Sequence, residues 1–229
     1  MAVSSYVGEE IITNIIIKQG EKTLEKEYFP RSVFNDPEGK SAYIIGNGES
    51  RKDFDLYSLP QDTYGCNALY RDYEPDFLVV IDRKMYQEVV EQEYDQKNTV
   101  YTNHLNISRY GGTPHLIPKN PHYGAGSSCM HIAVMDGHTD LTCIGFDCAE
   151  DGPNNNIYKD TNAYNKSDVI VHQTVWAKQI YDFMLSYPSV TFRFVEGTLP
   201  EKFFNLANCN AISYVQLADR VNTQNDKTI

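Results

Sequence analysis

Short apolar runs alternate along the middle of the chain with longer segments whose apolar residues recur at helical spacing. Near-continuous apolar runs are typical of strands that are covered on both faces of a parallel sheet. Strands that alternate with helices indicate βαβ units. The pattern therefore predicts an α/β fold, with a Rossmann-like, doubly wound, mostly parallel sheet and helices on both faces. We expect strands at 42–45, 63–66, 77–81, 141–144 and 190–195, and helices at 83–93, 127–136 and 173–185.

The two ends of the chain have a different pattern. Residues 1–40 contain an apolar stretch, a polar turn and a second β-prone stretch, which predict an N-terminal extension with a hairpin. A Rossmann-like nucleotide-binding domain is expected over 41–220, and the mostly polar residues 221–229 are expected to be a disordered tail. The hairpin could pair with another subunit, so a homo-oligomer is compatible with the sequence.

The composition is that of a globular protein and narrows the choice of partners. Hydrophobic residues make up 41% of the chain, which supplies a core, and the formal net charge of −11 disfavours nucleic acid and anionic membranes. No apolar run has the length of a membrane span and no secretory signal is evident, so we expect a cytoplasmic protein. The five cysteines form no Cys-x-x-Cys pair and are expected to be reduced and buried.

A Gly-Asn-Gly-Glu-Ser loop at 46–50 directly follows the expected strand at 42–45. Glycines allow the backbone to turn sharply and approach a ligand, while exposed amides and the Ser50 hydroxyl can donate to phosphate oxygens. In doubly wound sheets, ligands bind outside the carboxyl ends of the strands, which is where this loop would lie. The alternative is a plain tight turn, because Gly-x-Gly alone is a weak signal.

Two more polar side chains follow expected strands. Asn67 comes after the strand at 63–66 and Asp82 after the strand at 77–81. An amide can read a base or a ribose through its paired donor and acceptor, and a carboxylate can bind ribose hydroxyls or a magnesium ion. Each residue taken singly could also be a simple strand terminator. Together with the glycine loop they predict a shared pocket for phosphate and base.

Two further segments offer chemistry. Gly126, Ser127 and Ser128 open an expected helix, where they can bind an anion, cap the helix, or do both. A loop of about 25 residues follows Asp147 and is long enough to be a lid or a binding loop. It ends at His172, which is the best candidate for a general base because imidazole titrates near neutrality, although a structural role is the alternative.

The order of these motifs resembles that of the bacterial sialyltransferase family that includes the lipooligosaccharide sialyltransferases. It also resembles the related 6-hydroxymethylpterin diphosphokinase-like domain. The resemblance covers about residues 42 to 195 and is carried by Gly46-Asn47-Gly48-Glu49-Ser50, Cys66-Asn67-Ala68-Leu69-Tyr70, Gly126-Ser127-Ser128-Cys129-Met130 and Gly145-Phe146-Asp147.

The sialyltransferase resemblance implies a glycosyltransferase that uses a nucleotide-activated sugar, such as a CMP-sugar, and a small-molecule or glycan acceptor. It implies that His172 is the base and that Tyr158 steadies the departing phosphate. Ala149 stands where another such tyrosine is expected, and Ala125 stands where a serine is expected. The implied nucleotide-binding residues are Gly46, Asn47, Gly48, Ser50, Asn67, Gly126 and Ser127, to which the strand end and the helix start add Asp82 and Ser128.

Two alternatives stay open. Asp82 fits the diphosphokinase-like branch better, because the sialyltransferases tend to have Asn at this strand end. That branch implies ATP and Mg²⁺, with Asp82 and Asp147 as the residues that would carry the metal. The departures at Ala125 and Ala149 allow a third possibility, a non-catalytic nucleotide-binding protein.

Overall fold

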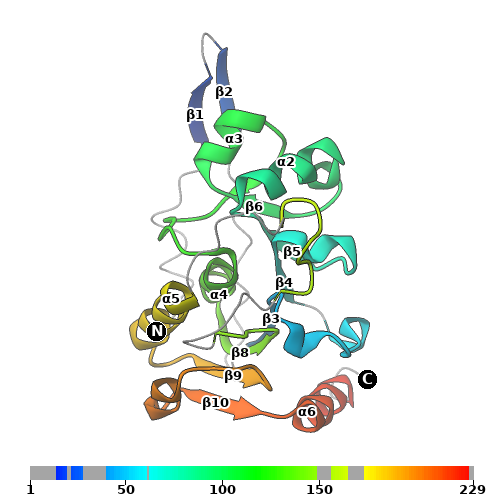
Figure 1. Ribbon diagram of the computed structural model, residues 1–229. Coiled ribbons are helices and arrows are strands. Elements are labelled where there is room, and N and C mark those ends of the chain that lie inside the picture. Colours follow the sequence, from blue (N-terminus) through cyan, green and yellow to red (C-terminus); the bar gives the residue numbers. More distant parts are fainter. Residues whose placement is uncertain are drawn as a thin grey trace.

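The computed structural model describes residues 14–19, 22–27, 40–60, 62–148, 156–164 and 173–226. Its main element is an eight-stranded sheet with the order β10-β9-β8-β3-β4-β5-β6-β7, in which every strand pair is parallel. This confirms the predicted α/β class (Figure 1). The strands are β3 (Lys40–Ile45), β4 (Thr63–Cys66), β5 (Phe77–Val79), β6 (Val100–Thr102), β7 (His115–Leu116), β8 (His138–Ile144), β9 (Thr191–Val195) and β10 (Cys209–Ile212).

Helices connect the strands and cover the sheet. The α-helices are α2 (Arg83–Glu91), α3 (His104–Tyr110), α4 (Ala125–Met135), α5 (Gln173–Ser186) and α6 (Tyr214–Asp226). Short 3-10 helices follow several strands: η1 (Glu49–Arg51), η2 (Leu56–Ser58), η3 (Asn67–Arg71), η4 (Tyr94–Gln96) and η5 (Glu201–Asn205).

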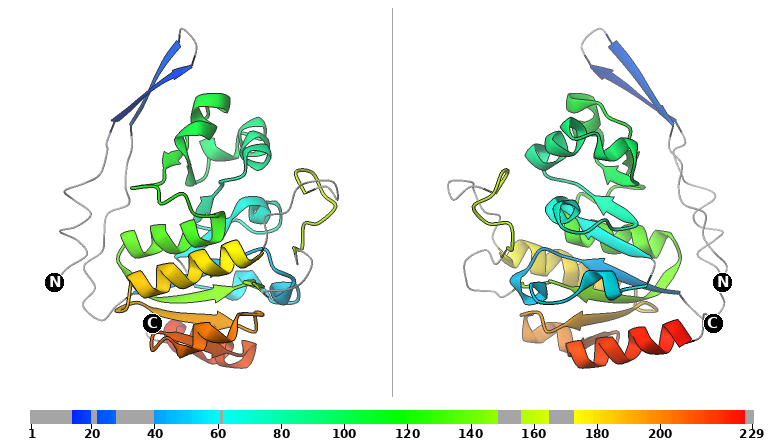
Figure 2. Two further views of the ribbon diagram at one scale, coloured as in Figure 1. Left: turned by 60° about the vertical axis from the view of Figure 1, so that its left-hand side comes forward. Right: turned by 90° about the vertical axis from the view of Figure 1, so that its right-hand side faces the viewer.

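The core has two layers because successive side chains of a strand point to opposite faces of the sheet. Along β3, Ala42 and Ile44 belong to one buried cluster, and Tyr43 and Ile45 belong to the other. The first cluster includes side chains of α4 and α5, and the second includes side chains of α2 and α6. Figure 2 shows α4 and α5 side by side on one face and α6 on the opposite face. The helices therefore lie on both faces, as predicted.

The strand order reverses beside β3. After β3 the chain moves outward through β4, β5, β6 and β7, and it then returns to the other side of β3 as β8 before continuing to β9 and β10. Ile45 at the end of β3 is in register with Ile144 at the end of β8. The loops that leave these two strands therefore start side by side and diverge, which is the topological switch point where ligands bind in open α/β sheets.

The five expected strands and three expected helices are all present, with ends shifted by a few residues. The prediction of a disordered tail from residue 221 needs correction, because α6 continues to Asp226 and Val221 is buried against the core. β6, β7, β10 and α3 were not predicted. All five cysteines are free and buried, as expected.

The N-terminal extension contributes two described strands, β1 (Asn14–Gln19) and β2 (Lys22–Glu27), which pair antiparallel and do not join the large sheet. β1 lies close to α3. Figures 1 and 2 show this pair projecting from the main body. Within the described ranges, no helix combines the length and the hydrophobicity that crossing a bilayer requires.

Candidate functional site

The glycine loop after β3 lies against the loop that follows β8. The Gly46 amide donates to the Ile144 carbonyl at 2.8 Å, and the Gly48 amide donates to the Gly145 carbonyl at 2.9 Å. A Cβ on Gly46 would stand 2.4 Å from the Gly145 oxygen, and one on Gly48 would stand 2.5 Å from an Asp147 carboxylate oxygen. Both distances are too short for any side chain. The glycines are therefore required for close packing between the two loops at the switch point.

An internal carboxylate takes a position that the sequence suggested for phosphate. The Ser50 amide donates to Asp147 Oδ2 at 2.9 Å. The amides of Gly46, Gly48 and Ser50 thus have acceptors within the protein. The anion next to the Ser50 amide is the protein's own Asp147.

Two side-chain oxygens of the same loop have no hydrogen-bond partner among the described residues. They are Asn47 Oδ1 and Ser50 Oγ, both shielded from solvent. The other end of the Asn47 amide is used, since Nδ2 donates to the Cys66 carbonyl at 3.1 Å. Buried polar atoms are rarely left without a partner. These two atoms are therefore side-chain groups of the loop that a ligand can satisfy.

Asn67 and Asp82 come together across the ends of β4 and β5. Asn67 has a φ of 50°, a left-handed conformation that asparagine tolerates better than most residues. Its Nδ2 donates to Asp82 Oδ2 at 2.7 Å, and its Oδ1 accepts from the Ile81 amide at 3.2 Å. The Asn67 amide therefore holds the two strand ends together. It is not the free donor–acceptor pair that base reading requires.

Asp82 is the solvent-accessible member of this pair. Desolvation by the surrounding protein raises the pKa of its carboxyl, and the hydrogen bond from Asn67 opposes that rise only in part. Asp82 is therefore the residue of the pair that can contact a ligand, and Asn67 orients it.

Tyr164 is a site residue that the sequence analysis did not single out. Its hydroxyl oxygen is shielded from solvent and makes no hydrogen bond of standard geometry in the described part of the chain. Burial raises the pKa of this phenol and the nearby Asp82 charge raises it further, whereas the neighbouring Asn67 amide acts to lower it. The net rise keeps the hydroxyl protonated near neutral pH. The available signal was a second tyrosine in the long loop, six residues after Tyr158.

Tyr158 is the tyrosine that was predicted to steady the departing phosphate. Its hydroxyl interacts with other groups of the protein. The side chain is buried, and its oxygen accepts from Arg51 Nη2 at 3.1 Å. Burial raises the pKa of the phenol, and a hydrogen bond with Asp72 adds to the rise. Arg51 thus engages the Tyr158 hydroxyl in a direct hydrogen bond, whereas the Tyr164 hydroxyl makes none of standard geometry among the described residues.

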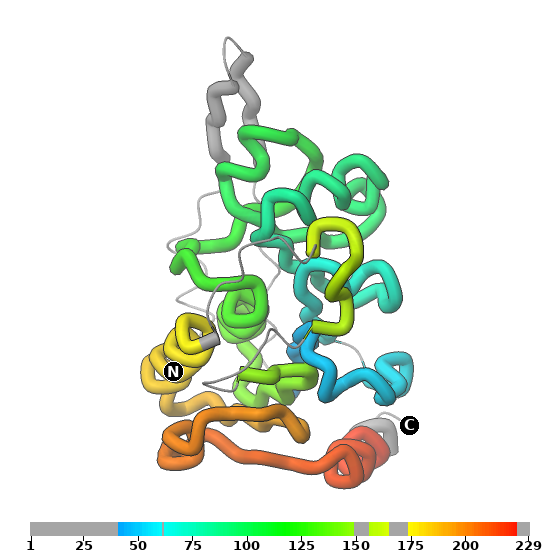
Figure 3. The backbone as a smooth tube through the Cα atoms, viewed as in Figure 1, coloured from blue at the N-terminus to red at the C-terminus, as the bar shows by residue number. Residues whose placement is uncertain are grey.

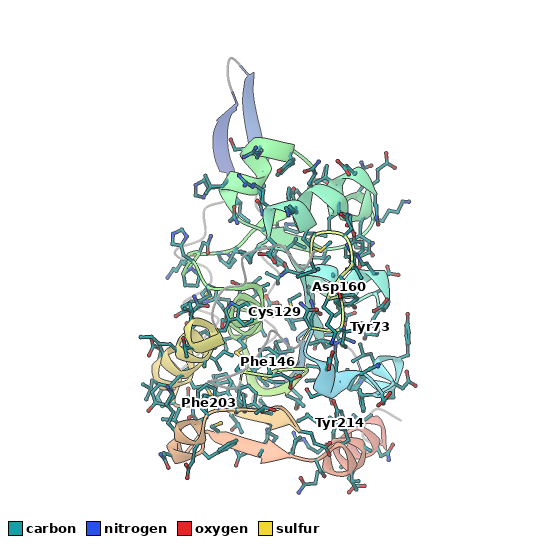
Figure 4. All side chains as sticks on the ribbon, in the orientation of Figure 1. Tyr73, Cys129, Phe146, Asp160, Phe203 and Tyr214 are labelled. Carbon is teal, nitrogen blue, oxygen red and sulfur yellow. The ribbon has the colours of Figure 1, made fainter. Side chains whose placement is uncertain are left out.

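The start of α4 and the glycine loop both pack against the Phe146 side chain, which belongs to the loop after β8. A Cβ on Gly126 would stand 3.1 Å from the Phe146 ring, and one on Gly46 would stand 3.3 Å from it. Figure 4 labels Phe146 near the middle of the molecule. The helix begins after Gly124, so Ser127 and Ser128 lie in its first turn and are not its cap. Ser128 is fully buried and donates to the Tyr123 carbonyl at 3.3 Å, whereas Ser127 is buried beside it.

Packing thus brings together most of the predicted residues. The glycine loop is joined to the end of β4 through Asn47, to the loop after β8 through Ser50, and to the start of α4 through Phe146. Asn67 joins the end of β4 to Asp82. His172 and Ala149, which were also part of the prediction, lie outside the described residues.

The described residues give no support to a magnesium site. No three His, Cys, Asp or Glu side chains come together as metal ligands within the described ranges. The two carboxylates that were considered for the metal have different partners, since Asp82 accepts from Asn67 and Asp147 accepts from the Ser50 amide. They do not fit a shared magnesium ion in this arrangement.

No protein-family model matches the sequence, and no curated protein matches it either. The fold is similar to that of the monofunctional α-2,3-sialyltransferase Cst-I from Campylobacter jejuni, with a TM-score of 0.51 at 12% identity, covering 72% of this chain and 78% of that chain. CstII from the same organism, solved with a CMP-based substrate analogue, gives a TM-score of 0.45 at 13% identity over 68% of this chain and 81% of that chain. The resemblance inferred from the order of motifs is confirmed at the level of the fold.

Proposed function

We propose that this protein is a glycosyltransferase-like enzyme that uses a nucleotide-activated sugar, with a CMP-sugar as the first donor to test. The observation that carries the proposal is the set of polar groups at the switch point: Asn47, Ser50 and Tyr164 each have a shielded oxygen that makes no hydrogen bond of standard geometry with a described residue, and Asp82 is accessible. The fold shared with a sialyltransferase supports the same class of reaction.

The groups left for a ligand near the ends of β4 and β5 are mainly hydrogen-bond acceptors. Asp82 offers a carboxylate, and Asn47 offers Oδ1 because its Nδ2 is already bound to Cys66. Acceptors bind donors, so the part of the ligand placed here carries hydroxyl or amino hydrogens. The ribose diol and the exocyclic amino group of cytosine are groups of this kind. We therefore assign the nucleoside to the ends of β4 and β5.

Hydroxyl donors are proposed to bind the phosphate. The Tyr164 phenol stays protonated because its pKa is raised, so it can donate to an oxygen that gains negative charge as the sugar leaves. The Ser50 hydroxyl and Ser127, in the first turn of α4, are the other donors that we assign to this group. Tyr158 positions the segment that carries Tyr164.

His172 is proposed to take the proton from the acceptor hydroxyl, because an imidazole titrates near neutral pH. In the forward step the acceptor oxygen bonds to the anomeric carbon of the sugar. The bond from that carbon to the phosphate oxygen breaks, and its electron pair leaves with the nucleotide. The acceptor proton passes to His172 and from there to solvent.

A ligand screen by thermal unfolding tests the proposal. We expect CMP and CMP-sugars to raise the unfolding midpoint with EDTA present, because binding to the folded state at 100 times Kd stabilises it by about 2.7 kcal/mol. A shift that needs ATP and Mg²⁺ would favour the diphosphokinase alternative. Release of CMP from a CMP-sugar in the presence of glycan acceptors then tests turnover. The absence of a shift with any nucleotide would overturn the proposal.

A further inference from the structure

Residues 156–164 form a run of turns that carries Tyr158 near its start and Tyr164 at its end. Figure 3 shows this segment beside the parts of the chain that contain β4 and β5. Its first contact is with the glycine loop, because the Ile157 amide donates to the Asn47 carbonyl at 2.9 Å. Further contacts to the body of the protein join Lys159 to Glu49 and Asn162 to Glu88, and two arginines, Arg51 and Arg71, make the rest of those described next.

Arg51 is buried and directs its guanidinium at both the glycine loop and the segment. Nε donates to the Gly46 carbonyl at 2.7 Å, and Nη2 donates to the Tyr158 hydroxyl at 3.1 Å. The guanidinium carbon lies 5.8 Å from the centre of the Tyr158 ring. No salt bridge joins Arg51 to a carboxylate within the described ranges. The Tyr158 hydroxyl, which accepts from Arg51, also interacts with the Asp72 carboxylate. One side chain thus couples Gly46 to Tyr158.

Arg71 holds the other end of the segment. Its Nη1 donates to Thr161 Oγ1 at 2.8 Å, and its Nη2 donates to the Asn162 carbonyl at 3.0 Å. The same guanidinium is oriented by Glu88 on α2, with Nε at 2.7 Å and Nη2 at 2.6 Å from the two carboxylate oxygens. Its carbon lies 6.0 Å from the Tyr158 ring centre. A bidentate ion pair of this kind fixes geometry as well as charge.

Placing two guanidinium groups against a single tyrosine ring is unfavourable on its own. Like charges repel, and taking a cation out of water costs several kcal/mol unless good partners replace the water. A loop that only had to be anchored could use apolar side chains. Arg51 instead directs its donors to the Gly46 carbonyl and the Tyr158 hydroxyl, and Arg71 divides its donors between Glu88 and the segment. This arrangement gives precise placement rather than maximal stability.

We propose that Arg51 and Arg71 are positioning residues that clasp Tyr158 and hold residues 156–164 against the sheet edge, so that the Tyr164 hydroxyl stands beside Asp82. The inference rests on the proposed function for its catalytic consequence. The placement of the segment is a property of the protein without ligand. Of the two arginines, Arg51 matters most, because it contacts both the segment and the glycine loop.

Hydrogen exchange on the ligand-free protein tests the placement. In Arg51→Met, which keeps length but removes all five donors, we expect amides of 156–164 to exchange about tenfold faster, equivalent to about 1.4 kcal/mol of local stability. Tyr158→Phe removes only the hydroxyl and should reproduce part of this change even if the first variant folds poorly. Arg109→Met is the matched control, because Arg109 is exposed and lies 5.7 Å from the Tyr110 ring, away from the segment.

Turnover of a CMP-sugar tests the consequence. We expect Arg51→Met to lower kcat about tenfold with little change in the acceptor KM, because the Tyr164 hydroxyl acts on the departing phosphate and not on the acceptor. Arg51→Lys, which keeps charge but loses the fork of donors, should recover only part of that loss. Unchanged exchange over 156–164 in both Arg51→Met and Tyr158→Phe would overturn the clasp. If the two variants exchange faster over 156–164 but the wild type turns over no CMP-sugar, the clasp is supported and the proposed function is contradicted.

Discussion

Polar side chains near the amino ends of the strands differ in their hydrogen bonding from those at the carboxyl ends. On β8, towards its amino end, Asp140 is paired with two arginines, Arg193 through one oxygen and Arg220 at 2.9 Å through the other. At the carboxyl ends of β3 and β4, by contrast, Asn47 keeps a shielded oxygen without a partner among the described residues. A polar cluster that satisfies itself stabilises the fold, whereas one that leaves atoms unpaired has capacity for a ligand. This difference is our basis for assigning the carboxyl ends of the strands to the proposed site and the Asp140 cluster to stability.

Two tyrosine hydroxyls, both shielded from solvent, make the comparison direct. The Tyr64 hydroxyl, towards the amino end, donates to Asp136 Oδ2 at 2.6 Å and lies 3.1 Å from His138 Nε2. The Tyr164 hydroxyl, at the carboxyl edge, has no such partner in the described part of the chain. Removing each hydroxyl therefore tests the same atom in a satisfied and in an unsatisfied setting.

Tyr164→Phe should produce the largest effect. We expect CMP-sugar turnover to fall about 10²- to 10³-fold, the cost of losing one donor to a developing negative charge, while the free energy of unfolding changes little. Steady-state kinetics and denaturant unfolding of the same preparation measure both quantities. Wild-type turnover in this variant would show that the Tyr164 hydroxyl does not face the reacting phosphate.

Asp82→Ala should weaken nucleotide binding at the same edge. A hydrogen bond to a charged group contributes about 1.5–3 kcal/mol, so we expect the Kd for CMP to rise roughly 10- to 100-fold. Isothermal titration calorimetry gives the value. Asp140→Ala is the counterpart on β8 and should leave the Kd within about twofold, because that carboxylate is used by arginines. Equal losses in both variants would contradict the distinction between the two ends.

Tyr64→Phe should affect stability alone. Without the phenol, the buried Asp136 carboxylate loses a hydrogen-bond donor, and an unsatisfied buried group costs about 1–3 kcal/mol. We expect a lower denaturation midpoint, with turnover of the folded enzyme unchanged. A loss of activity at full stability would mean that this end of the sheet also takes part in function.

The smallest expected effect is a pH dependence at Asp82. Because burial raises the pKa of this carboxyl in the folded state, the folded protein holds its proton to a higher pH than the unfolded chain does. The Asp82 contribution to stability therefore falls as the pH rises from below the unfolded value of about 3.9 through the folded value. Asp82→Asn removes that loss. Its unfolding midpoint should gain on the wild type as the pH rises from acid towards neutral, and a difference independent of pH would contradict the raised pKa.

Much of the fold could be predicted from the sequence, and the misses have physical causes. β6 and β7 have three and two residues, too few for a periodic pattern. α6 was taken in part for a tail because its surface is polar, and only a few residues such as Leu217 and Val221 anchor it to the core. By contrast, α4 is buried on almost every side, and its apolar character was readable along the chain.

The need for glycine at 46 and 48 has a tertiary cause, because a Cβ there would meet Gly145 or Asp147 of the loop after β8. For the site, the sequence was sufficient to place polar side chains at strand ends. It could not determine which polar groups are already occupied. The Ser50 amide is matched by Asp147, 97 residues away, and Asn47 by the Cys66 carbonyl, 19 residues away. Only the tertiary structure decides such pairings, since hydrogen bonds between distant segments depend on how the strands are ordered in the sheet. The same packing bonds the Tyr158 hydroxyl to Arg51 and leaves the Tyr164 hydroxyl, near Asn67 and Asp82, without a hydrogen bond of standard geometry among the described residues.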